Sequence, residues 1–200
     1  MPRELGRNDR RSRIAYLAAR LMAEDGIEDY SLAKRKAARQ AGMAETRELP
    51  TNEEIDAALK AYQDIYHPDE HRDRLRELRT IAVQAMREFA KFNPHLTGSV
   101  LTGSAGKYAD IKLQLFTDDE KAVELYLIDR GIPYRAEQGR VYAGTELRAV
   151  PVYIIDDEGA AIELTVLRPR DLRGPLKSTL EGKNIERAKL QAVELLLAGS

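Results

Sequence analysis

The spacing of apolar residues divides the chain into a helical first half and a second half with strand-like alternation. In the first half, apolar positions recur every three or four residues, which predicts amphipathic helices over residues 12–25, 31–40, 51–66 and 68–89. From residue 95 onward, apolar and polar residues alternate, which indicates strands. We therefore expect an α+β protein, with an α-helical region over residues 1–93 and a domain over residues 94–200 in which a mixed sheet has flanking helices.

The second half is predicted to contain extended segments joined by turns and two helices. A first hairpin is expected to turn around Gln138-Gly139, between residues 133–135 and 140–143, and a second to pair residues 150–155 with 160–167. The remaining elements expected are a short extended piece at 95–97, a strand at 109–116, a helix at 118–131, a polar loop at 168–184 and a last helix at 185–197.

Composition excludes several classes of protein. The 200 residues carry a net charge of −1, so a polyanion would have to meet a local basic patch, and the absence of cysteine excludes disulfides and thiolate metal sites. No apolar run approaches the ~20 residues of a membrane span, and the N-terminus lacks the apolar core of a signal peptide. We expect a cytoplasmic protein without a membrane partner, and the long amphipathic helices leave an oligomer open.

The candidate chemistry centres on residues 96–116. Two Gly-Ser pairs, Gly98-Ser99 and Gly103-Ser104, precede a strongly alternating strand. Along that strand Asp110 and Lys112 share one face, which places a carboxylate and an ammonium two residues apart. Small turns of this kind let backbone N–H groups approach phosphates. A later strand carries Glu163 among apolar neighbours.

This combination resembles the DNA-polymerase-β-type nucleotidyltransferase superfamily over roughly residues 92–167. Leu96-Thr97-Gly98-Ser99 looks like the family's Gly-Ser turn, Asp110 like its first metal carboxylate and Glu163 like its third. The resemblance implies that Gly98 and Ser99 cradle the phosphates of an NTP and that Asp110 and Glu163 hold Mg²⁺. It also implies that Lys107 or Lys112 offsets the negative charge of the nucleotide. Lys112 would do so as a residue of the catalytic centre, and Lys107 as a residue that binds the nucleotide.

The chain departs from the family pattern at the second carboxylate, where Lys112 stands. A protonated lysine cannot ligate a metal ion, so the sequence leaves open whether the protein is an enzyme. The first hypothesis is a Mg-dependent transferase that moves a nucleoside monophosphate from an NTP to an acceptor hydroxyl. The alternative is a catalytically degenerate module of the same fold that binds nucleotide, RNA or a protein partner. A third reading is a plain α+β interaction protein, in which Asp110 and Lys112 form a surface ion pair.

A basic segment in the helical half suggests the acceptor. Its cations gather within one short predicted helix: Lys34, Arg35, Lys36 and Arg39. We expect them to contact the phosphate backbone of RNA, with tRNA as one candidate, although a solvated basic face explains such a cluster as well.

Overall fold

The computed structural model describes residues 2–27, 29–44, 46, 48–66, 68–157, 159–178 and 184–199, with backbone only for residues 2–8 and 68. The chain forms two compact units that are interleaved in sequence. The first unit contains Met1–Arg74 and Gly103–Tyr108, and the second contains Leu75–Thr102 and Ala109–Ser200. The expected division between residues 93 and 94 therefore differs from this grouping, which places residues 75–93 with the sheet.

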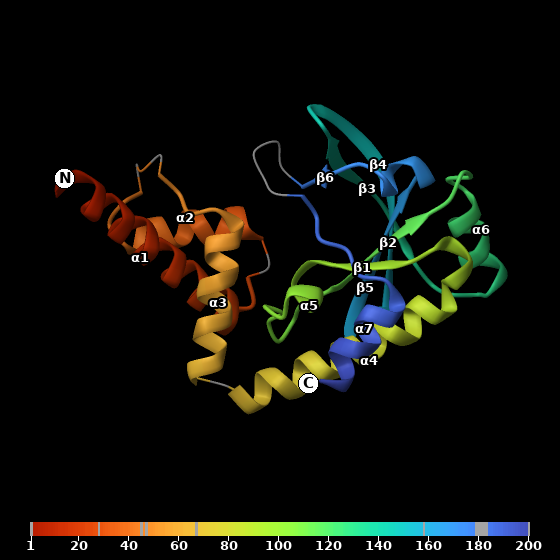
Figure 1. Cartoon of the computed structure of the whole chain (residues 1–200), viewed down its shortest axis with the longest axis horizontal. Coiled ribbons are helices and arrows are strands. Elements are labelled where there is room, and N and C mark those ends of the chain that lie inside the picture. Colours follow the sequence, from red (N-terminus) through yellow and green to blue (C-terminus); the bar gives the residue numbers. More distant parts are fainter. Residues whose placement is uncertain are drawn as a thin grey trace. The chain divides into compact units, whose positions relative to one another are not determined.

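The first unit is built from helices α1 (Pro2–Asp25), α2 (Tyr30–Gln40) and α3 (Asn52–Tyr66), drawn from red to orange in Figure 1. Small residues let α1 and α2 approach closely, because Ala18, Ala33 and Ala37 are fully buried. The starts of the helices follow from local hydrogen bonds. Asp29 accepts from the backbone of Ser31 at 2.7 Å and caps α2.

A loop from the middle of the chain completes the first unit. Gln63 donates to the carbonyl of Ala105 at 3.1 Å, and Arg74 donates to the carbonyl of Lys107 at 3.1 Å. The Tyr108 ring lies against Gly26, where a Cβ would come within 2.7 Å of the ring. Residues 103–108 are thus held by the helices of the first unit.

The second unit is an α+β assembly around one mixed sheet of order β1-β2-β5-β4-β3-β6. Strand β2 runs parallel to β5, and the other neighbouring pairs are antiparallel. The strands are β1 (His95–Thr97), β2 (Ile111–Phe116), β3 (Arg135–Ala143), β4 (Glu146–Asp157), β5 (Ala160–Leu167) and β6 (Leu176–Lys177). Its helices are α4 (Pro68–Glu88), which begins in the first unit, α5 (Gly98–Thr102), α6 (Ala122–Asp129) and α7 (Leu190–Ala198), with 3₁₀ turns η1 (Ala90–Phe92) and η2 (Pro169–Leu172).

One face of the sheet is a continuous apolar surface. Ile111, Leu113 and Leu115 of β2, with Ile162 and Leu164 of β5, are at most 3% exposed. The helices of the second unit pack against one another, since Arg87 of α4 contacts Glu194 of α7 at 2.7 Å and the Tyr126 ring of α6 packs on Phe89.

The opposite face of the three strands β1, β2 and β5 is polar. We call it the polar face and define it by His95, Thr97, Lys112, Gln114, Glu163 and Thr165. Toward its far end the same side of the sheet becomes apolar, where Phe116, Val150 and Leu176 pack together. The segment after β5 covers that apolar end.

Several sequence-based expectations require correction. The turn predicted at Gln138-Gly139 is wrong, because β3 runs straight through Gly139 and the hairpin turns after Ala143. A Cβ at Gly139 would lie 2.7 Å from Val152 Cγ2, so this glycine makes room for a side chain on the neighbouring strand. The real turn contains Gly144, whose φ of 66° favours glycine.

The last helix is shorter than expected. It begins at Leu190 instead of Ile185, because residues before it form extended backbone pairings. Ile185 N–H donates to Leu176 at 2.7 Å, and Ala188 exchanges two hydrogen bonds of 2.9 Å with Leu96. The predicted polar loop contains η2 and β6, and its residues 179–183 lie outside the described part.

The helices predicted from the spacing of apolar residues are confirmed as α2, α3 and α4. The first predicted helix, α1, begins earlier than expected, at Pro2, and includes the arginine-rich start of the chain. The predicted pairing of residues 150–155 with 160–167 is also confirmed, within longer strands. No helix in the described part of the chain combines the length and apolarity that a membrane crossing requires.

Candidate functional site

The turn between β1 and α5 lies directly beside Lys112. Gly98 opens α5 with a φ of 72°, a conformation that favours glycine. A Cβ at Gly98 would lie 3.5 Å from Cδ of Lys112. Thr97, the residue before the turn, is the Cα partner of Lys112 on the neighbouring strand. The predicted phosphate turn and Lys112 therefore belong to one small area of the sheet.

Lys112 is paired with Glu163. The two residues are Cα partners on the parallel strands β2 and β5, and Nζ lies 3.4 Å from Oε2. The lysine side chain is 51% exposed and the glutamate side chain 28%. Thr165 donates to the other carboxylate oxygen of Glu163 at 3.4 Å. A lysine thus stands against the carboxylate that was expected to hold a metal ion.

The other expected site residues are Asp110, Ser99 and Lys107, and the structure places each of them in a different element or loop. Asp110 immediately precedes β2, so the strand expected from residue 109 begins two residues later and Asp110 is not a strand residue. Ser99 lies in α5, where its carbonyl accepts from Thr102 at 3.4 Å. Lys107 belongs to the first unit, and its Nζ lies 5.5 Å from the centre of the Tyr108 ring. The structure brings Gly98, Lys112 and Glu163 together.

The donor set around Glu163 does not fit a two-magnesium centre. Such a centre needs several carboxylates around the ions, and here the described neighbour of Glu163 on β2 is an ammonium group. Among the residues whose placement is described, no group of three or more His, Asp or Glu side chains is arranged to hold a metal ion. We therefore derive no step through magnesium.

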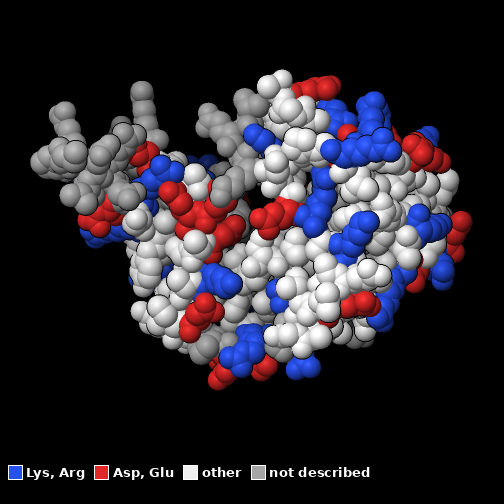
Figure 2. Space-filling view, in the orientation of Figure 1, with Lys and Arg blue, Asp and Glu red and all other residues white. Residues whose placement is uncertain are grey.

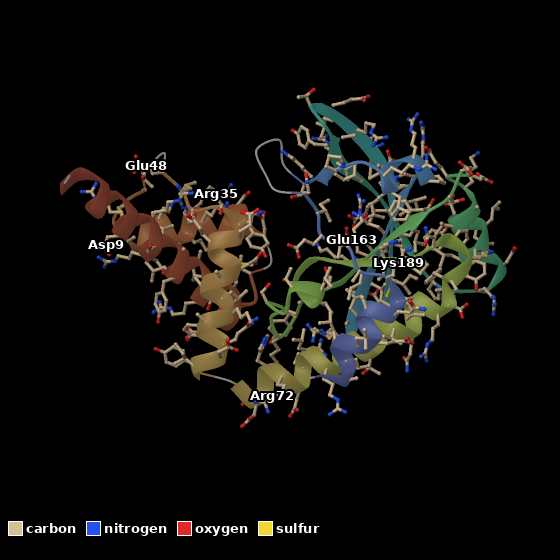
Figure 3. All side chains as sticks on the ribbon, viewed as in Figure 1. Asp9, Arg35, Glu48, Arg72, Glu163 and Lys189 are labelled. Carbon is tan, nitrogen blue, oxygen red and sulfur yellow. The ribbon has the colours of Figure 1, made fainter. Side chains whose placement is uncertain are left out.

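Two cations that the sequence did not single out border the polar face. The antiparallel bridge between Leu96 and Ala188 sets Thr97 beside Arg187 and His95 beside Lys189. Arg187 Nε donates to Gln114 Oε1 at 2.7 Å. The sequence placed residues 185–197 in a helix, so no local signal pointed to a strand-like approach of Arg187 to β1. Figure 3 labels Glu163 and Lys189 in the second unit.

Of the basic residues expected to meet RNA, three are exposed and one is engaged. Arg35, Lys36 and Arg39 lie on the solvent side of α2, opposite its buried alanines. Lys34 instead donates to Asn52 Oδ1 at 2.7 Å, and burial lowers the pKa of its ammonium group. At most three of the four cations are therefore available on this helix.

Comparison of the sequence with protein-family models and with curated proteins gives no match.

Proposed function

We propose that the second unit is a nucleotidyltransferase-like module whose polar face binds the phosphates of a nucleoside triphosphate. The observation that carries this proposal is the placement of Gly98, Lys112 and Glu163 within one area of three adjacent strands. The order of elements supports it: a glycine turn after the first strand, polar residues at the start of the second, and a glutamate on a later strand parallel to it.

Binding without nucleotidyl transfer is the form of this function that the ion pair favours. In transfer, an acceptor hydroxyl would attack the α-phosphorus, lose its proton to a base and expel pyrophosphate. The Lys112 ammonium offers positive charge to the phosphates but neither accepts that proton nor ligates a metal ion. We therefore place phosphate binding first, with Lys112 released from Glu163 to meet the ligand.

Transfer is the second candidate, supported by the position of Asp110 next to β2. Asp110 precedes Lys112 by two residues, and it is the residue that resembles the first metal carboxylate of a metal-dependent transferase, with Glu163 as the third. In this version Asp110 and Glu163 would be the carboxylates of the transfer site, and RNA or tRNA would lie along Arg35, Lys36 and Arg39. A cytoplasmic location fits either version.

The test is the thermal stability of the protein with each of the four NTPs, with and without Mg²⁺. A ligand at about 100 times its dissociation constant stabilises the folded state by ~2.7 kcal/mol, which is a readily measured shift. We expect stabilisation by at least one NTP, and we expect Lys112→Met to reduce it. Lys121→Gln, which removes an exposed cation at the start of α6, is the matched control and should leave the shift unchanged.

The role of Asp110 separates the two versions. A shift that needs Mg²⁺ and disappears in Asp110→Ala would favour the transferase, and incorporation of labelled nucleotide into RNA would then be measured. A shift that persists in Asp110→Ala and without Mg²⁺ favours binding alone. If no NTP stabilises the wild-type protein under either condition, the proposal is wrong and a plain interaction protein remains.

A further inference from the structure

Arg187 is a guanidinium group whose described hydrogen bonds all go to neutral acceptors. Nε donates to Gln114 Oε1 at 2.7 Å, and Nη1 donates to the carbonyl of Leu172 at 3.4 Å. Nη2 is buried and has no hydrogen-bond partner among the residues that the structure describes. Buried charges in proteins are normally paired with an opposite charge. The Cζ of Arg187 also lies 5.7 Å from the centre of the Phe116 ring, and Arg187 forms no ion pair with a carboxylate among the described residues.

The carboxylate whose charge acts on Arg187 already has a partner. Burial lowers the pKa of Arg187, and the charge of Asp171 raises it. Asp171, however, lies 2.7 Å from Arg148 in an ion pair whose two side chains are 18% and 9% exposed. Asp171 also accepts from the backbone N–H of Arg168 at 3.2 Å. The negative charge of Asp171 is thus largely committed to Arg148.

Lys189 adds a second cation next to the same strands. It is exposed at the start of α7 and forms no ion pair with any residue in the described part of the chain. The Leu96–Ala188 bridge puts the side chains of Arg187 and Lys189 on one side of the backbone, since residues two apart in an extended segment share a face. That side is the polar face, because Arg187 reaches Gln114 there.

The sum of charges on this face is positive. Its three cations are Arg187, Lys189 and Lys112, and they outnumber two carboxylates, Glu163 opposite Lys112 and Asp110 directly before β2. His95 does not add a charge near neutral pH, because burial lowers the pKa of its imidazole. The hydrogen bond to the Asn93 carbonyl raises this pKa, whereas the charges of Lys189 and Arg187 lower it further. Figure 2 shows several Lys and Arg side chains across the visible face of the second unit, with fewer acidic ones between them.

From this arrangement we propose that Arg187 and Lys189 supply the charge for a polyphosphate chain, so that the polar face binds it without a divalent cation. The inference rests on the proposed function and assigns to these two side chains the positive charge that a divalent cation would otherwise supply. Lys112 and Lys189 touch the phosphate oxygens from two sides of β1 and β2. Arg187 acts from behind them as a positioned, partly buried cation that orients Gln114 and raises the local positive potential.

The experiment measures binding of inorganic tripolyphosphate by calorimetry, in EDTA and at fixed ionic strength, to the full chain. We expect the wild-type protein to bind, and we expect Lys189→Gln to weaken binding about tenfold, the effect of losing one charge-assisted hydrogen bond. Arg187→Met should weaken binding too. Lys189 is exposed, so Lys189→Gln tests the idea even if the Arg187 variant unfolds. Lys121→Gln is the control and should bind as the wild-type protein does.

The outcomes separate this inference from the function on which it rests. If Lys189→Gln binds tripolyphosphate as tightly as the wild-type protein does, the proposed role of Lys189 is wrong, and the nucleotide proposal still stands. Binding that appears only with Mg²⁺ would overturn the metal-free mode alone. An equal loss in Lys121→Gln would show a general charge effect and overturn the site. If neither tripolyphosphate nor any NTP binds with or without Mg²⁺, both proposals fail.

Discussion

Lys112 and Glu163 face each other on two parallel strands, with Nζ 3.4 Å from Oε2. The pair lies on the polar face, beside the left-handed turn at Gly98. Because the Lys112 ammonium group already balances the charge of the Glu163 carboxylate, this partly buried carboxylate does not require a metal ion as a counter-charge. A ligand phosphate has to compete with Glu163 for Lys112.

The ion pair itself should contribute little to stability. Lys112 is half exposed, and exposed pairs typically contribute 0.2–1 kcal/mol, so we expect a coupling free energy below ~1 kcal/mol. The measurement is a double-mutant cycle of Lys112→Met and Glu163→Gln, followed by urea unfolding. The matched control is Arg168–Glu120, at 3.1 Å with side chains 51% and 50% exposed, probed with Arg168→Met and Glu120→Gln.

A coupling above ~2 kcal/mol for Lys112 and Glu163 would contradict this expectation, since it belongs to buried pairs. It would mean that the pair is a structural element of the sheet, and that Lys112 is not readily released to a phosphate.

Gly98→Ala should destabilise the folded state by ~1–2 kcal/mol. The space is sufficient, because the nearest atom would be Lys112 Cδ at 3.5 Å, but the φ of 72° is costly for any residue with a Cβ. The free energy of unfolding in urea measures the effect. Gly174→Ala is the control, since no atom lies within 4 Å of a Cβ there and no positive φ is required. Equal effects of the two substitutions would show that backbone strain at Gly98 is not what demands glycine.

Asp56 in the first unit should make stability depend on pH. Burial raises the pKa of its carboxyl group above the ordinary 3.8, although hydrogen bonds from the Tyr30 hydroxyl and from Ser104 oppose the shift. The folded protein then binds the proton more tightly than the unfolded chain. The stability contributed by the protonated form is present below pH 3.8 and is lost as pH rises through the folded pKa.

Urea unfolding of the wild-type protein and Asp56→Asn at about pH 3.5 and about pH 7 checks the sign. The wild-type protein should lose stability relative to the variant as pH rises between those values. A difference that stays constant, or that moves in favour of the wild-type protein, would show that the hydrogen bonds from Tyr30 and Ser104 outweigh burial.

Elements with a strong local signal could be predicted from the sequence. The period of apolar residues in α3 and α4, and the alternation around Leu113 and Leu164, each identify an element without knowledge of the fold. The capping box at Thr51 and Glu54 is equally local, with hydrogen bonds of 2.7 and 3.2 Å. The proximity of Gly98 and Lys112 could be predicted for the same reason, because the turn and the strand are close in sequence.

Features that depend on distant partners could not be predicted. Gly139 has the composition of a turn, and only the packing of Val152 over it explains why it continues a strand. Residues 185–189 have the pattern of a helix start, but pairing with Leu96 holds them extended. Arg187 is brought to Gln114 by that same pairing, across 73 residues of sequence. No window of local sequence carries such information.

The loop of residues 103–108 makes the two units inseparable along the chain. It leaves the second unit after Thr102, is fastened by Gln63, His71 and Arg74, and returns at Ala109. With the passage inside α4 after Arg74, three covalent connections join the units, so no single cut yields either one intact. Local opening of the helical unit would loosen the chain that leads from Gly98 to Lys112. We therefore expect proteolysis or mutation in the helices of the first unit to disorder the segment between Gly98 and Lys112. We also expect the protein to unfold in one cooperative transition.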